Sequence, residues 1–126
     1  MTKAPGTKYI MPQELEVWYV LPTIRRELAK SLLDLQLSRE KISEILGVSK
    51  ASISHYLRRK RGNEVEFDDE LIKKIKESAI RIVENENNYL EEVQELCKFI
   101  RVSRRLCQIH MEKSNSSYAT CTVCLE

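Results

Sequence analysis

The apolar positions of this chain recur mostly at helical spacing, and stretches that alternate between apolar and polar residues are scarce. Only three Gly and three Pro interrupt its 126 residues. We expect a flexible arm at residues 1–11 and then a helical stretch from Pro12 to Leu35. Pro22 should kink or restart this helix, because proline lacks an N–H donor and its ring clashes with the preceding turn. The apolar stripe of the helix comprises Leu15, Trp18, Tyr19, Ile24, Leu28 and Leu32.

Residues 37–62 predict two short helices around a sharp corner. Ser38 is expected to cap a helix that ends at Leu46, where Gly47 supplies the positive φ of the turn. Ser49 then caps a second helix, in which Ile53, Tyr56 and Leu57 are spaced to face the core. The remaining positions carry Lys50, Ala51, Ser52, Ser54, His55 and Arg58, followed by Arg59, Lys60 and Arg61.

This arrangement follows the helix-turn-helix plan, in which the first turn of the second helix approaches base edges in the major groove. Bulky apolar side chains are excluded from such a surface, and a basic cluster beyond it can contact phosphates. A plain helical hairpin is the alternative interpretation. If the unit binds double-stranded DNA, the contacting residues are expected to be Ser49, Lys50, Ser52, Ser54, His55, Arg58, Arg59, Lys60 and Arg61.

Two longer amphipathic helices are expected after this unit. Asp68 can cap the first, which should run to about Glu84, and "NENN" separates it from a helix that starts near Tyr89. Such helices either complete the core or form a dimer interface. The inward positions are expected to be Leu71, Ile75, Ala79, Ile82 and Val83 in the first helix and Leu90, Val93, Leu96, Cys97 and Ile100 in the second.

Four cysteines suggest metal binding in a reducing compartment. On an unbroken helix Cys97 and Cys107 would lie about 15 Å apart, too far for one site, so a shared site requires a bend near Ser103. One ligand set is Cys97, Cys107, Cys121 and Cys124, which suits an iron–sulfur cluster or zinc. The other replaces Cys97 by His110 and suits zinc. The long Cys-x₉-Cys spacing favours the cluster, while disulfides and unligated thiols remain alternatives.

The charge is segregated along the chain. Residues 1–62 carry a net charge of +6, residues 63–96 carry −7, and residues 97–126 carry +3. A basic surface separated from an acidic one favours nucleic acid as a partner, and the acidic segment should lie away from it. No apolar run approaches the about 18 residues of a membrane span, and the first residues lack a signal-peptide core. We therefore expect a soluble, cytoplasmic protein with no membrane partner.

The stretch "GVSKASISHYLRRKRG" closely resembles the Cro/phage-repressor type of helix-turn-helix. The match is carried by Gly47, Val48, Ser49, Ile53, Ser54, Tyr56, Leu57, Arg61 and Gly62. Ser43 departs from the pattern, since that family usually packs Ala between the two helices. Together with "EVWYVLPTIRRELAKSLLDL" and the cysteine-rich tail, the chain is similar to a family of archaeal predicted transcriptional regulators. Some members of that family carry a further cysteine at the position of Gln94 in this chain. The resemblance implies archaeal origin and promoter binding.

We expect an all-α fold: a repressor-like helix-turn-helix bundle of about five helices with a small cysteine-rich C-terminal metal-binding extension. Residues 12–85 would form the DNA-binding domain, and residues 86–126 would form a C-terminal helix plus cysteine cluster. The function expected is that of a sequence-specific transcriptional regulator, binding DNA as a homodimer. The alternative is a metal-binding adaptor of the transcription machinery with secondary DNA contact. No catalytic constellation or small-molecule substrate motif is visible, so we expect a non-enzyme.

Overall fold

The structure is a computed structural model that describes residues 11–58 and 65–114. Within these ranges it consists of helices and turns without a strand, which confirms the all-α prediction. None of these helices is long and apolar enough to cross a membrane. The segments are α1 (Pro12–Leu15), η1 (Glu16–Val20), α2 (Leu21–Asp34), α3 (Arg39–Leu46), α4 (Lys50–Leu57), α5 (Asp69–Glu84), η2 (Glu86–Asn88), α6 (Tyr89–Val102) and α7 (Arg105–Ser114).

The first three segments follow one another without a gap and form one rod, interrupted by the π-helical turn η1. This turn lies directly before Pro22, and the N–H of Leu21 donates to the carbonyl of Glu16 across it. The Thr23 hydroxyl donates to the Tyr19 carbonyl at 2.7 Å. The wider turn accommodates a residue that has no N–H of its own. The predicted restart at Pro22 is therefore confirmed. Counting the rod once, the described ranges hold six helices, compared with the about five expected.

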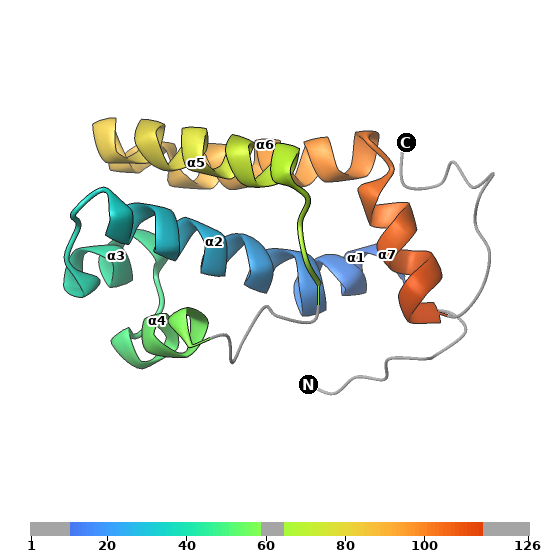
Figure 1. Ribbon diagram of the computed structural model, residues 1–126, viewed down its shortest axis with the longest axis horizontal. Coiled ribbons are helices and arrows are strands. Elements are labelled where there is room, and N and C mark those ends of the chain that lie inside the picture. The colour runs from blue at the N-terminus through green and yellow to red at the C-terminus, as the bar shows by residue number, and fades with distance from the viewer. Residues whose placement is uncertain (1–10, 59–64, 115–126) are drawn as a thin grey trace.

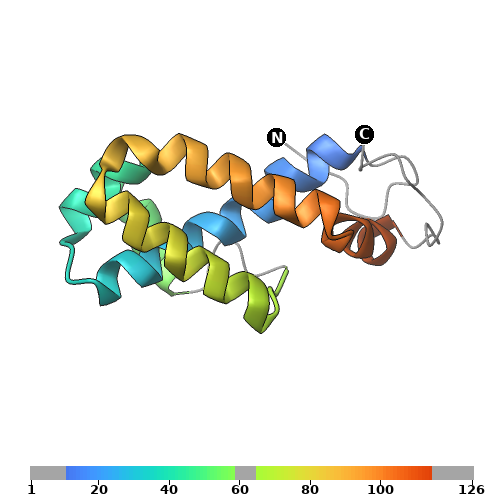
Figure 2. The same ribbon diagram turned by 90° about the horizontal axis from the view of Figure 1, so that it is seen from above.

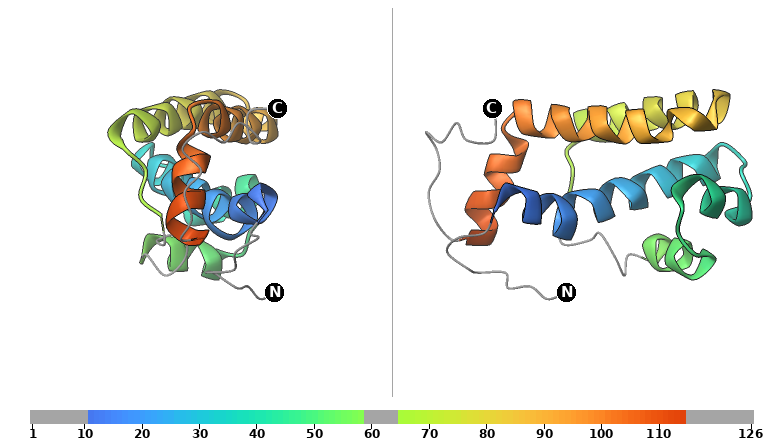
Figure 3. Two further views of the ribbon diagram at one scale, coloured as in Figure 1. Left: turned by 90° about the vertical axis from the view of Figure 1, so that its right-hand side faces the viewer. Right: turned by 180° about the vertical axis from the view of Figure 1, so that it is seen from behind.

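α2 is the central element, because it packs against α3, α4 and α5. The α5–α6 pair lies on one side of α2 and α4 on the other (Figures 1 and 3). α5 and α6 meet at η2 and diverge toward their other ends (Figure 2). At that open end α7 runs across the bundle beside α1 and contacts both α1 and α6. The C-terminal helices are thus packed onto the N-terminal rod.

The core contains most of the apolar positions that the helical spacing predicts. Two predictions are wrong: Val83 is 42% exposed and Leu90 is 71% exposed. Both lie near the end of their helices that adjoins η2, where the apolar stripe extends beyond the packed surface. The core residues with no exposed surface include Leu15, Ile24, Leu28, Leu32, Ile42, Ile53, Ile75, Ile82 and Leu106.

Candidate nucleic-acid interface and cysteine region

The corner between α3 and α4 is built by local hydrogen bonds. The Ser38 side chain caps α3 by accepting from the N–H of Lys41 at 3.1 Å. Gly47 has a φ of +69° and its N–H donates to the Ser43 carbonyl at 2.9 Å, which closes the helix. The Ser43 hydroxyl donates to the carbonyl of Val48. Ser43, the residue that departs from the repressor pattern, therefore stabilises the corner through the hydrogen bond of its hydroxyl to the backbone of the turn.

α4 is fixed at its start by Ser49 and along its inner face by two buried side chains. The Ser49 hydroxyl accepts from the N–H of Ser52 at 3.1 Å, the N-cap predicted from the sequence. Ile53 has no exposed surface and Tyr56 is 3% exposed. Leu57 is partly buried and packs against the same core. These residues hold α4 against α2 and fix which of its residues face outward.

The outer face of α4 presents small polar and basic side chains. Ser49, Lys50, Ala51 and Arg58 are exposed. Ser52, Ser54 and His55 are half-buried. Arg59, Lys60 and Arg61, which the sequence assigned to phosphate contacts, lie outside the described residues. The described part of the predicted DNA-contacting set thus shares one helix, with the larger charged side chains at its two ends.

Arg25 lies beneath α4 and was not identified from the sequence. It is half-buried on α2. Burial lowers the pKa of its guanidinium, but the hydroxyls of Tyr89 and Tyr56 raise it, and the net shift is upward. Tyr56 belongs to α4 and Tyr89 to α6, so Arg25 reaches side chains from both layers. The sequence shows two adjacent arginines within an apolar helix. Helical spacing alone does not predict which neighbours such long side chains reach.

The next residue forms a buried ion pair. Arg26 is 5% exposed and bonds to Glu27 through its Nη2 at 2.8 Å and its Nε at 3.2 Å. Lys30 approaches the same carboxylate group at 3.8 Å. Adjacent helical residues do not normally face each other, so the side chains must bend to meet. Arg26 and Glu27 are both removed from water, and each provides the opposite charge that the other needs there.

The acidic part of the chain lies away from α4. α5 and α6 carry most of the carboxylates of residues 65–95, and these helices are separated from α4 by α2 (Figures 1 and 3). Several carboxylates are paired, such as Glu92, which accepts from Arg81 at 2.8 and 3.0 Å. The acidic helices and the outer face of α4 therefore lie on different sides of α2.

A second corner joins α6 to α7, as predicted from the spacing of the cysteines. α6 ends at Val102, Ser103 follows it, and Arg104 has a φ of +66°. The N–H of Ser103 donates to the Phe99 carbonyl at 2.9 Å and that of Arg104 to the Arg101 carbonyl at 3.0 Å. Cys97 and Cys107 therefore lie on different helices. Both are free thiols, 4% and 2% exposed respectively.

Metal binding at the cysteines requires thiolates, since the thiol form is not a ligand. Burial, and after it the Glu16 carboxylate, raises the pKa of Cys97 to about 11, while Arg101 and Arg25 act in the opposite direction. Among the residues that the structure describes, no three His, Cys, Asp or Glu side chains are grouped to hold a metal ion. Cys107 and His110 lie three positions apart on the buried side of α7. Cys121 and Cys124 lie outside the described residues.

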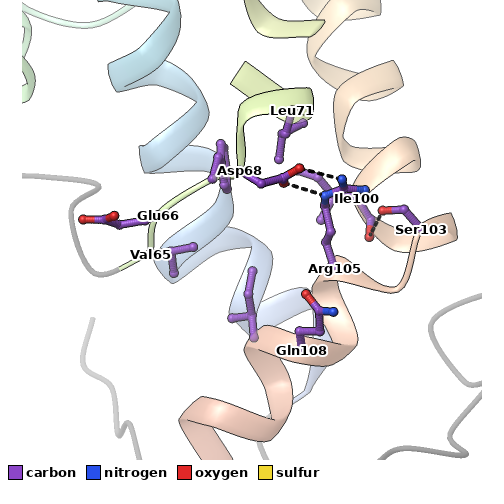
Figure 4. Close-up of a pocket in the computed structure, with 10 residues that line it drawn as sticks. Val65, Glu66, Asp68, Leu71, Ile100, Ser103, Arg105 and Gln108 are labelled. Carbon is purple, nitrogen blue, oxygen red and sulfur yellow. Dashed lines mark hydrogen bonds and ion pairs between the residues drawn. The ribbon is translucent and has the colours of Figure 1, made fainter. Parts of the chain in front are cut away.

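The second corner is held by a long-range ion pair. The Arg105 Nε and Nη2 donate to the two carboxylate oxygens of Asp68, each at 2.8 Å, and Nη2 also donates to Glu70 at 3.0 Å (Figure 4). Its guanidinium lies 4.8 Å from the centre of the Phe99 ring. Asp68 occupies the predicted N-cap position of α5, but its side chain makes no cap hydrogen bond there and pairs with Arg105 instead.

A cavity of about 640 Å³ lies beside this pair, where the divergent ends of α5 and α6 face α7 (Figure 4). Leu71, Ile100 and Ile109 form part of its wall, with Ser103 and Gln108 as neutral polar groups. The Arg105–Asp68 pair lines it too, and the Ser103 hydroxyl donates to the Ile100 carbonyl at 3.4 Å. Since Arg105 is largely engaged by Asp68 and Glu70, the polar lining does not define one class of ligand.

Comparison of the chain with protein-family models, with curated proteins and with solved structures gave no match.

Proposed function

We propose that the protein is a sequence-specific DNA-binding transcriptional regulator in which α3, the Gly47 corner and α4 form a helix-turn-helix. The observation that carries this proposal is the division of α4 into two faces. Ile53 and Tyr56 anchor the inner face, and the outer face holds small polar and basic residues from Ser49 to Arg58. A recognition helix needs both properties, because it must be held rigidly and still approach base edges.

The roles of individual residues follow from their places on α4. Lys50, Ser52, Ser54, His55 and Arg58 would lie nearest the bases, because they occupy the outer face and its edges. Ser49 would lie at the phosphate backbone, where the start of the helix approaches the groove. Arg59, Lys60 and Arg61 would contact phosphates beyond the end of α4. The resemblance to the Cro/phage-repressor helix-turn-helix and to archaeal predicted regulators supports the same assignment.

A homodimer is part of this proposal. Helix-turn-helix dimers place two recognition helices in major grooves about 34 Å apart, so the operator would contain two related half-sites. Phosphate contacts would release counterions, and the affinity would fall steeply with salt concentration.

A C-terminal metal site is the third part of the proposal. Cys107, Cys121 and Cys124 would bind zinc or an iron–sulfur cluster, with Cys97 or His110 as the fourth ligand. Burial of Cys107 and His110 on one side of α7 supports the set with His110 and hence zinc, whereas the all-cysteine set suits the cluster. The bound metal would fix the C-terminal segment to α7. Metal analysis and the visible spectrum of anaerobically purified protein distinguish the two cofactors.

DNA binding is tested by fluorescence anisotropy with the DNA upstream of the protein's own gene and with random DNA of equal length. Arg58→Ala should lower the affinity about tenfold, as expected for loss of one base contact, without loss of helical structure. Lys98→Ala is the matched control, because it removes one exposed positive charge from α6. Equal affinity for both DNAs would contradict sequence specificity, and equal effects of the two substitutions would contradict the role of α4.

A further inference from the structure

Exposed aliphatic side chains gather at one place on the surface, between the C-terminal end of α2 and α5. Leu35 is 40% exposed, Ile80 is 49% exposed and Val83 is 42% exposed. Leu35 and Ile80 line the same cleft of about 240 Å³, and Val83 lies one helical turn from Ile80. Isolated apolar residues are normal on a protein surface, but a contiguous patch around a cleft is typical of an interaction site. This patch is called the α2–α5 cleft.

The charges beside the cleft indicate what can cover it. Asp34 from α2 and Lys76 from α5 both line it, and both are exposed. Within the described residues, neither takes part in an ion pair. One edge of the cleft is therefore acidic and the other basic. A two-fold axis passing through the cleft would place α2 of one copy against α5 of another, and each unlike pair would then form twice. Self-complementarity of this kind is the requirement of a symmetric dimer.

We propose that the α2–α5 cleft is the face through which two copies of this chain associate, with Asp34 of each copy paired with Lys76 of the other. Leu35, Ile80 and Val83 would form the apolar centre of the contact, and the two ion pairs would flank it. The relevance of this dimer to operator binding rests on the proposed function, but the contact itself does not.

The position of the cleft is compatible with DNA binding by both subunits. α5 and α4 lie on opposite sides of α2 (Figures 1 and 3), and the cleft residues come from α2, its C-terminal end and α5. A contact at this cleft does not use any residue of α4. Both α4 helices would therefore remain exposed in the dimer.

Analytical ultracentrifugation over a series of concentrations tests the contact. The full chain should dimerise, and Ile80→Asp should make it monomeric, because a charge would replace the apolar centre. Leu90→Asp is the matched control: it places the same charge at a more exposed aliphatic residue on α6 and should leave the dimer intact. A monomeric full chain would overturn the proposal, and so would a dimer that Ile80→Asp leaves unchanged. Circular dichroism checks that each variant is folded.

The charge pair provides a second test that does not alter the apolar centre. Lys76→Glu should lower the dimerisation constant about tenfold, because two like-charge contacts would arise at once. Asp34→Lys combined with Lys76→Glu should restore it, since the unlike pairs are then exchanged. Failure of the double variant to recover would contradict the predicted pairing, even if Ile80→Asp were unfolded.

Anisotropy with the same variants separates this proposal from the proposed function. Dimerisation without DNA binding would support the cleft as the interface and contradict the DNA-binding role. A monomer that binds DNA through α4 would support the DNA-binding role and contradict the cleft as the interface.

Discussion

Two corners of the molecule each contain a residue with a similar positive φ, but the residue type differs between them. Gly47 between α3 and α4 has a φ of +69°, and Arg104 between α6 and α7 has a φ of +66°. Glycine adopts this conformation freely, whereas an L-amino acid with a side chain is strained there by about 1 kcal/mol or more. The first corner therefore has an intrinsic preference for its turn, and the second must be held in it by other contacts.

The contacts that hold the two corners differ in range along the chain. At the first corner Ser38, Ser43, Gly47 and Ser49 make bonds that span five residues at most. At the second, Arg105 pairs with carboxylates 35 and 37 residues away. Local bonds depend on residue type and spacing, which the sequence displays directly. The long-range pair requires α5 and α6 to be packed first.

The largest effects test whether the helices that follow the two corners belong to one cooperative core. Ile53 in α4 and Leu106 in α7 both have no exposed surface. Ile53→Ala and Leu106→Ala should each lower the free energy of unfolding by about 2–5 kcal/mol, the usual cost of truncating a buried aliphatic side chain. Urea titration followed by Trp18 fluorescence and by circular dichroism measures both.

The control for these two variants is Leu90→Ala, which truncates a residue that is 71% exposed and should change stability by under about 0.5 kcal/mol. A small effect of Leu106→Ala beside a large one of Ile53→Ala would show that α7 is not part of the common core. The contacts of α7 with α1 and α6 would then contribute little to folding.

Exchanging the residue types at the two corners should change stability by an intermediate amount, with one sign for Gly47→Ala and the opposite sign for Arg104→Gly. Gly47→Ala should destabilise the protein by about 1 kcal/mol, because a Cβ would meet no atom within 4 Å and only backbone strain remains. Arg104→Gly should stabilise it by a few tenths to about 1 kcal/mol, since relief of the strain exceeds the added freedom of the unfolded chain. Thermal unfolding of both variants measures the shifts, and a destabilised Arg104→Gly would mean that the Arg104 side chain matters more than its backbone.

Sequence reasoning succeeded where a local rule determines the structure. The caps at Ser38 and Ser49, the turn at Gly47 and the restart at Pro22 each follow from the chemistry of one residue and its neighbours. The bend near Ser103 was predicted from the spacing of the cysteines, although no glycine marks it. The failures depend on packing: Val83 and Leu90 continue a helical stripe past the last neighbour, and Asp68 meets an arginine that only the folded chain brings near.

The candidate site also has one part that local rules predict and other parts that depend on packing. The outer face of α4 could be predicted because burial of Ile53 and Tyr56 fixes the rotation of a short helix. Arg25 could not, since its partners Tyr56 and Tyr89 come from two other helices. The α2–α5 cleft could not be predicted either. Leu35, Ile80 and Val83 differ from the core residues only in that they remain exposed once the helices have packed.

The smallest effect concerns the ion pair that holds the second corner, and it depends on pH. The Arg105 guanidinium lowers the pKa of the Asp68 carboxyl from its ordinary 3.8 to about 2. The pair therefore stabilises the folded protein above about pH 4, and this contribution is lost as the pH falls from about 4 to about 2.

Since the Asp68 side chain is 49% exposed, the contribution of the ion pair to the free energy of unfolding should be under about 1 kcal/mol. Arg105→Ala should lower stability at neutral pH by at least that amount, since it also removes the bond to Glu70 and the contact with Phe99, and its difference from the unsubstituted protein should shrink on acidification. Lys74→Ala is the control, because Lys74 also lies over the Phe99 ring, at 4.7 Å, and has no ion pair with Asp68 in the described residues. Urea titrations at a series of pH values measure both variants, and an equal loss of acid dependence in Lys74→Ala would assign the effect to Phe99 instead of the ion pair.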